Sequence, residues 1–216
     1  MNSPYHYDSK FMQALALLAD YLILNFLYVL LCIPIFTIGA AQAGLYNGLR
    51  ILTSKENESS CIKAFFRGFR NGFGKITLVW GVVSVITLFL GYNILAVYVF
   101  KTAGYSYSTS ALVFSIIGTS IAAVYQSMLT LFHAFFDCTI RQLIRNVFLV
   151  IMANPLRSIA VTLLVWAPII LSVINFVLFL QMAFLLVFLY YSIALSVSVR
   201  LMSAPFQRLI DNLPQE

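Results

Sequence analysis

Long uncharged apolar runs, separated by short polar or basic segments, dominate the chain. The first run extends from about Ala14 to Ile33 and stops at Pro34, which disfavours helix at the residue before it. Other apolar runs cover residues 76–100, 111–136 and 156–202. Each is long enough to cross a hydrocarbon core of about 30 Å as a helix. The pattern predicts an all-α protein, a polytopic bundle of transmembrane helices.

The last of these runs is too long for a single crossing. It contains 47 residues without a charged side chain except Arg157 and Arg200 near its ends. The polar residues Asn175 and Gln181 bracket the best place for a break. We therefore expect two spans here, joined by a turn that carries no charge.

A weaker apolar segment, residues 38–53, follows Pro34 and is rich in small residues. Ala40, Gly44 and Gly48 are four positions apart and share one face of a helix, which allows a neighbouring helix to approach closely. In this interpretation Pro34 ends the first helix, Thr37 caps the second, and Gly39 begins its packed face. The segment would then cross back through the membrane; the alternative is a re-entrant or surface helix.

Two basic segments show helical amphipathicity. In residues 61–75 the apolar positions lie within one arc and the cations on the other side. The aromatic face would enter the acyl boundary while the cations contact anionic headgroups. Residues 140–154 begin with the same pattern. Each segment is predicted to be an interfacial elbow that orients the next span, or else a lipid-sensing or partner-docking site. The apolar set is Ile62, Phe65, Phe66, Phe69 and Phe73, and the lipid-interface cations are Lys63, Arg67 and Arg70.

The two elbows belong to a weak internal repeat. Gln42 begins a small-residue helix that leads through a basic segment to Trp80, and Gln126 to Trp166 follow the same order. The spacings are 38 and 40 residues. We therefore describe residues 1–216 as one integral membrane domain, with a helix–elbow–helix repeat over 38–100 and 111–178 as a hypothesis.

Composition excludes a soluble protein. Hydrophobic residues make up 62% of the chain and charged residues 9%, whereas soluble domains are closer to half apolar and a quarter charged. The net charge of +6 does not indicate nucleic-acid binding, because the basic residues flank the apolar runs as the positive-inside rule expects. Three scattered cysteines, Cys32, Cys61 and Cys138, form neither a disulfide framework nor a metal motif.

Charge distribution also predicts the topology. With residues 38–53 crossing, there are six spans, and twelve of thirteen lysines and arginines face the cytoplasm, with Lys101 outside. Without that crossing there are five spans and the N-terminus moves outside. Eleven lysines and arginines then face the cytoplasm and two lie outside. We expect six spans in a bacterial plasma membrane, with both termini cytoplasmic. The A-x-A triplet at 41–43 fits a cleaved signal poorly, because Asp20 interrupts the apolar region before it.

Residues 25–50, NFLYVLLCIPIFTIGAAQAGLYNGLR, and the following AFFRGFRNGFGKITLVW resemble the YesL-type family of bacterial membrane proteins. The family signature has an early Asn, a P-[IL]-x-T-[IV]-G-x-A motif, a stretch like A-x-x-A-L-Y, and a basic–aromatic segment. This chain departs from it with Gln42 and Gly44, where Thr and Ala are usual. The matching residues are Asn25, Pro34, Thr37, Gly39, Ala40, Leu45, Tyr46, Phe65, Phe69, Arg70 and Phe73.

The resemblance implies a multi-pass protein of Gram-positive-type bacteria, often encoded beside carbohydrate-uptake and polysaccharide-degradation systems. The family has no established biochemical activity. The resemblance therefore supplies a relative and a context, but no reaction.

Ionisable residues inside or near the spans are candidates for function, because burying them in a membrane is costly. Asp20 lies within the first span, and His133, Asp137 and Arg141 are spaced to share one helical face. Asp20 would pair with Arg50 or Arg200 around a polar cavity open to the cytoplasm. The alternative is that Asp20 has one structural partner and the other side chains extend to the interface. The candidate cluster is Asp20, Arg50, His133, Asp137, Arg141 and Arg200.

The sequence contains no HExxH, GxSxG or P-loop motif. We therefore expect no enzyme, no cofactor and no metal site. Two functions remain: an accessory or regulatory partner of a carbohydrate-uptake or envelope system, docking on a sugar-transporter permease, or a small-solute or lipid transporter with a cytoplasm-facing polar cavity. The few polar residues at mid-span favour the first. The ligand and the oligomeric state stay open.

Overall fold

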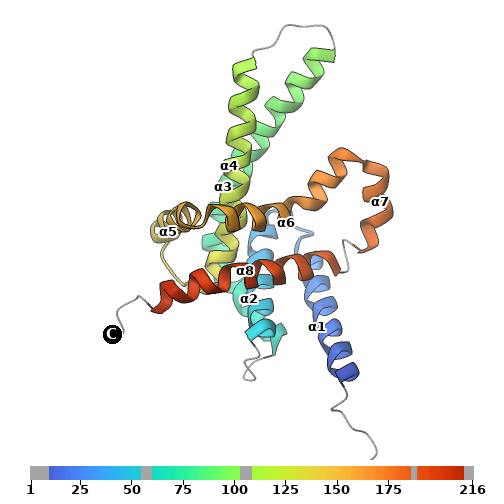
Figure 1. Cartoon of the computed structure of the whole chain (residues 1–216), viewed down its shortest axis with the longest axis vertical. Helices are drawn as coiled ribbons and strands as arrows, with labels where there is room; N and C mark the ends of the chain where they lie inside the picture. Colours follow the sequence, from blue (N-terminus) through green and yellow to red (C-terminus); the bar gives the residue numbers. More distant parts are fainter. Residues whose placement is uncertain (1–9, 55–59, 103–108, 186–188, 212–216) are drawn as a thin grey trace, which may run out of the picture.

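The computed structural model describes residues 10–54, 60–102, 109–185 and 189–211, and this part of the chain is helical without a strand. The all-α membrane fold expected from the sequence is confirmed. Figure 1 shows the helices in order along the chain. They are α1 (Lys10–Leu31), the 3₁₀ turn η1 (Ile35–Thr37), α2 (Ile38–Ser54), α3 (Cys61–Thr102), α4 (Thr109–Phe135), α5 (Ile140–Ala153), α6 (Pro155–Ile174), α7 (Phe176–Leu185) and α8 (Tyr191–Asp211).

The chain reverses direction at Pro34. Helix α1 ends at Leu31, and η1 then leads into α2, which runs back beside α1 (Figure 1). The buried Thr37 hydroxyl lies within hydrogen-bonding distance of the carbonyl oxygens of Leu31 and Pro34. It therefore satisfies carbonyls at the end of α1 and in the turn. The expectation that Thr37 caps α2 was wrong, because its hydroxyl donates backwards along the chain.

Helix α2 is the centre of the fold. Its side chains from Gly39 to Tyr46 are buried, and it contacts α1, α3, α4 and α8. A β-carbon at Gly44 would lie 2.9 Å from the carbonyl oxygen of Phe65, and one at Gly39 would lie 2.6 Å from Cγ of Trp80. Small residues are therefore required where α3 approaches α2, as at other close helix contacts in membranes.

Helix α3 runs without interruption for 42 residues, about 63 Å at 1.5 Å per residue. The expected elbow over 61–75 and span over 76–100 are thus one helix. Phe65 is fully buried against α2 and does not enter an acyl boundary, whereas Phe66 and Phe73 are exposed. The expected separation into an elbow and a span was wrong because no proline interrupts the segment. In addition, Gly68 packs against Asn47 of α2, which holds the first part of the helix against the bundle.

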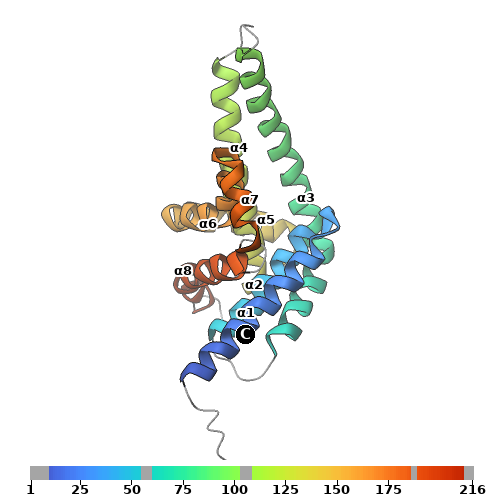
Figure 2. The ribbon, with the colours of Figure 1, turned by 90° about the vertical axis from the view of Figure 1, so that its right-hand side faces the viewer.

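Helices α3 and α4 form a long hairpin whose outer half extends beyond the other helices (Figures 1 and 2). Helices α5 and α8 cross the direction of this hairpin in both views. Helix α5 begins with a capping box, in which Thr139 and Gln142 bind each other's backbone N–H groups. Helix α8 is held to α1 by Asn25, whose buried side-chain oxygen accepts from the Ser192 N–H at 3.2 Å.

Four of the described helices are long and apolar enough to span a membrane: Met12–Leu31, Cys61–Val97, Thr109–Phe135 and Pro155–Ile174. The break predicted near Asn175 is present between α6 and α7. The second span expected beyond it includes residues 186–188, which lie outside the described residues; on either side, α7 covers Phe176–Leu185 and α8 covers Tyr191–Asp211. The count of six spans therefore exceeds what helix length and composition support in the described residues.

Candidate functional site

The polar residues predicted as a cluster meet only in part. A cavity of about 200 Å³ lies between α2, the start of α3 and the end of α4. Arg50, His133 and Asp137 of the candidate cluster line it, together with Arg67 of the expected lipid-interface set. Two further polar side chains, Asn47 and Asn71, complete the lining. We call this cavity the polar pocket.

Arg50 connects two helices at this pocket. Its Nη1 donates to the carbonyl oxygen of Ala134 at 2.8 Å, and its guanidinium lies 5.5 Å from the centre of the Phe135 ring. The carbonyl belongs to the last turn of α4, where backbone acceptors lack helical partners and a cation is favourable. Arg50 therefore stabilises the end of α4 from the end of α2.

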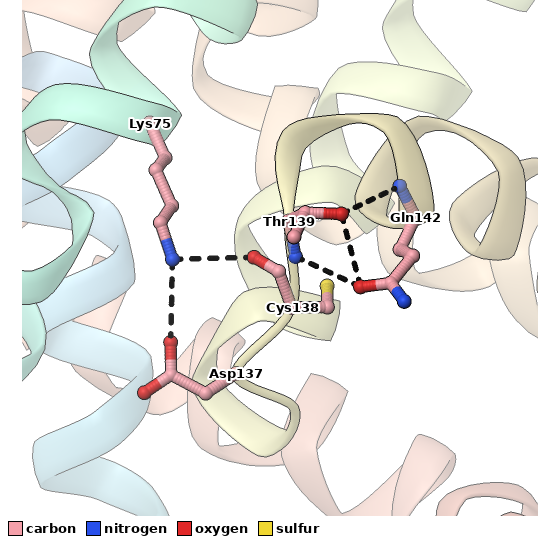
Figure 3. A network of polar contacts seen from close by, with 5 residues as sticks. All are labelled: Lys75, Asp137, Cys138, Thr139 and Gln142. Carbon is pink, nitrogen blue, oxygen red and sulfur yellow. Dashed lines mark hydrogen bonds and ion pairs between the residues drawn. The ribbon is translucent and has the colours of Figure 1, made fainter.

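The segment after α4 forms a second polar network (Figure 3). Lys75 Nζ lies 3.9 Å from Asp137 Oδ1 and donates to the Cys138 carbonyl oxygen at 3.3 Å. Both side chains of the ion pair are substantially exposed, so the pair contributes little to stability. Its effect is positional: it keeps the connection between α4 and α5 against α3.

The predicted helical face of His133, Asp137 and Arg141 does not exist. Helix α4 ends at Phe135, residues 136–139 are not helical, and α5 starts at Ile140. His133 is buried and Asp137 exposed, although both line the polar pocket; Arg141 is exposed on α5. Residues spaced i, i+4 and i+8 share a face only in a continuous helix, and α4 ends before it reaches Asp137.

Asp20 is also separate from the pocket. Its Oδ1 accepts a weak hydrogen bond from the Cys61 thiol, with a sulfur–oxygen distance of 3.7 Å. Within the described residues no ion pair joins Asp20 to Arg50 or Arg200. Arg200 is exposed on α8. The expected pairing of Asp20 was wrong, because Arg50 turns instead towards the end of α4.

The remaining predicted residues have packing or surface positions. Lys63, Arg67 and Arg70 are exposed on α3. Ala40, Gly44 and Gly48 lie in the buried face of α2, and Pro34 is exposed at the turn. Asn47 and Asn71 were missed by sequence reasoning. The signal for Asn47 was its place inside the GLYNG segment, next to the glycines that bring α2 and α3 together.

The polar pocket has the chemistry of a small anion site. Two arginines and two asparagines line it, while the one acidic residue, Asp137, faces Lys75. His133 Nδ1 is buried and has no hydrogen-bond partner. The pocket therefore offers cationic and amide donors to a small anion.

A larger cleft of about 840 Å³ lies among the candidate spans. Its lining includes the residues that begin and end each half of the internal repeat: Gln42 with Trp80, and Gln126 with Trp166. The side-chain amide of Gln126 donates to Ser84 Oγ at 2.7 Å, and the indole N–H of Trp166 donates to Ser127 Oγ at 3.1 Å. Sequence reasoning noted these residues as a repeat but did not identify them as a site.

Residues 21–94 match the model of a family described as a protein of unknown function, DUF624. The match covers about a third of the chain. DUF624 is the YesL-type family, so the resemblance seen in the sequence is confirmed over this third of the chain. No curated protein and no solved structure matches the chain significantly. The DUF624 segment contains the turn at Pro34, all of α2 and most of α3, and thus one wall of both cavities.

Proposed function

We propose that this protein is a non-enzymatic, multi-pass protein of a bacterial plasma membrane that acts as an accessory or regulatory partner of a carbohydrate-uptake or envelope system. The observation that carries the proposal is the poor fit of the polar pocket and of the larger cleft to a hydrophilic transported solute. Ligand pockets usually occupy about 300–1,000 Å³, and the polar pocket, at about 200 Å³, is smaller. The larger cleft is lined mostly by apolar side chains.

The α3–α4 hairpin supports an accessory role. Its outer half extends beyond the other helices and exposes large apolar side chains such as Phe89 and Phe114. A membrane protein can place such a surface against lipid or against the helices of a neighbouring protein. The carbohydrate context comes from the YesL-type family resemblance, and a sugar-transporter permease is the partner that this context favours.

The polar pocket supports a regulatory element in this role. Arg50, Arg67 and the two asparagines would hold a small anion, and such binding would stabilise the contact between α2 and the end of α4. By the positive-inside rule we expect this end of the bundle on the cytoplasmic side. The alternative function is transport, and the apolar lining of the large cleft then favours a lipid over a sugar.

Uptake measurements separate the accessory function from transport. We expect deletion in the native host to lower permease-dependent sugar uptake, and the intact chain to restore it. The purified chain in lipid vesicles should not raise uptake of the same sugar above that of empty vesicles. Uptake by the chain alone would contradict the accessory role, as would unchanged uptake in the deletion strain.

A pair of arginine variants tests the polar pocket in the same host. Arg50→Gln should impair restoration, because it removes a cation and the bond to the Ala134 carbonyl. Arg200→Gln is the matched control, since this side chain is exposed on α8 and does not line the pocket. Both variants must first reach the membrane in wild-type amounts. Equal restoration by the two would remove the pocket from the proposed function.

A further inference from the structure

The large cleft is built from all four candidate spans. Helix α1 contributes Tyr28, α3 contributes Trp80 and Leu88, α4 contributes Gln126, and α6 contributes Trp166. Among the residues that the structure describes, no lysine, arginine, histidine, aspartate or glutamate lines it. Its volume of about 840 Å³ and its apolar lining with a few polar groups are typical of small-molecule sites. An occupant of this cleft is therefore uncharged and largely apolar.

The cleft has a buried end and an exposed end. Gln42, Gln126 and Ser127 are buried, whereas Leu88 and Tyr92 on the outer half of α3 are 73% and 69% exposed. The exposed residues belong to a candidate span, so their surroundings in a membrane are acyl chains. The cleft is thus accessible from the lipid phase, and Gln42, Gln126 and Ser127 lie at its closed end.

Gln126 leaves a hydrogen-bonding atom unused at that closed end. The side chain is only 6% exposed, and its Nε2 donates to Ser84 Oγ, yet its Oε1 has no partner. Turning the amide over exchanges the two atoms and still leaves one of them unpaired. The hydroxyl oxygen of Thr119, also in the cleft lining, is buried without a partner as well. Buried polar groups without partners are rare in folded proteins and costly.

We infer that the cleft binds an uncharged, lipid-soluble molecule carrying a hydroxyl group, with that hydroxyl at Gln126 and the apolar body against Trp80 and Trp166. A hydroxyl both donates and accepts, so it completes the bonding of Gln126 in either amide orientation. Long-chain alcohols and monoacylglycerols have this chemistry. Phospholipids with charged headgroups do not fit the closed end, because no counter-charge lines it. The inference does not depend on the accessory role.

The chain carries its own reporters for this site. Trp80 and Trp166 are its two tryptophans, and both line the cleft. A long-chain alcohol brominated at its far end should therefore quench the intrinsic fluorescence of the purified protein in mild detergent. The matching bromoalkane, which lacks the hydroxyl, is the reference probe. We expect saturable quenching by the alcohol at about tenfold lower mole fraction than by the alkane, the effect of one hydrogen bond to a buried group.

Variants test the assignment to Gln126. Gln126→Leu should abolish the preference for the alcohol while leaving alkane quenching in place. Gln207→Leu makes the same change at an exposed position on α8 and should keep the wild-type preference. Thr119→Val, a smaller change in the same lining, provides a second test if Gln126→Leu lowers the unfolding temperature.

The wild-type comparison alone can overturn the inference, whatever the variants do. Equal quenching by the alcohol and the alkane would mean that the ligand hydroxyl forms no hydrogen bond with Gln126, whose side chain is then bound to water or unpaired. Quenching that rises without saturation would mean that the probes only dissolve in the detergent around the protein. A Gln126→Leu protein that is folded and still prefers the alcohol would remove the site from this end of the cleft.

Discussion

Single residues decide where helices can approach one another. Gly44 faces the backbone of α3, and Asn25, buried on α1, accepts the N–H of Ser192 in the first turn of α8. Both lie in the segment that matches the DUF624 family. Their roles are structural: Gly44 allows close contact because it has no side chain, and Asn25 accepts a backbone N–H at the start of α8.

Gly44→Ala should destabilise the protein. The new β-carbon would lie 2.9 Å from the Phe65 carbonyl oxygen, and overpacking of this kind costs about 1–3 kcal/mol. Gly74→Ala is the control, because a β-carbon there meets nothing within 4 Å and alanine favours helix. Thermal unfolding in detergent measures both. A Gly44→Ala protein as stable as Gly74→Ala would contradict the close contact between α2 and α3.

At the scale of elements, local capping and tertiary contacts act together at the α4–α5 connection. Thr139 and Gln142 begin α5 by mutual capping, while Lys75 of α3 holds the preceding Asp137 and Cys138 (Figure 3). The capping box follows from sequence spacing, but the role of Lys75 does not, because it lies 62 residues earlier than Asp137. Only the folded chain brings it there.

Thr139→Ala should weaken the first turn of α5 by about 1 kcal/mol, since the N-cap acceptor is lost. Hydrogen exchange of the α5 amides should then become faster, with the exchange of α2 unchanged. Thr139→Ser retains the hydroxyl and should behave like the wild type. If all three proteins exchange alike in α5, the capping box does not stabilise the helix in solution.

At the scale of the whole molecule, α2 is packed among other helices, although its length and composition do not mark it as a candidate span. Its 17 residues extend about 26 Å, and it runs antiparallel to α1 and α3 (Figure 1). It is surrounded by α1, α3, α4 and α8, so little of it would meet lipid. A shielded helix does not need the apolar surface that a lipid-facing one requires. The crossing of 38–53 therefore stays a prediction that membrane topology must test.

Thiol labelling tests this topology, because the chain has three cysteines and single-cysteine variants need two substitutions. We expect an impermeant maleimide to label Cys61 and Cys138 in inside-out vesicles and neither in intact cells. Burial raises the pKa of the Cys138 thiol, so its reactive thiolate is scarce at neutral pH and labelling should accelerate as the pH rises. Labelling of Cys61 in intact cells would reverse the predicted orientation.

The sequence by itself determined the membrane class, the helical fold, the family resemblance within residues 21–94, and the breaks at Pro34 and near Asn175. These follow from hydropathy, proline geometry and local spacing, which act over a few residues. Tertiary structure alone decided that the basic segment and the next span form one helix, that Arg50 meets Ala134 while Asp20 meets Cys61, and that Gln42, Trp80, Gln126 and Trp166 surround one cleft. Those pairings depend on how helices cross, and a helical period specifies a face without specifying which distant helix covers it.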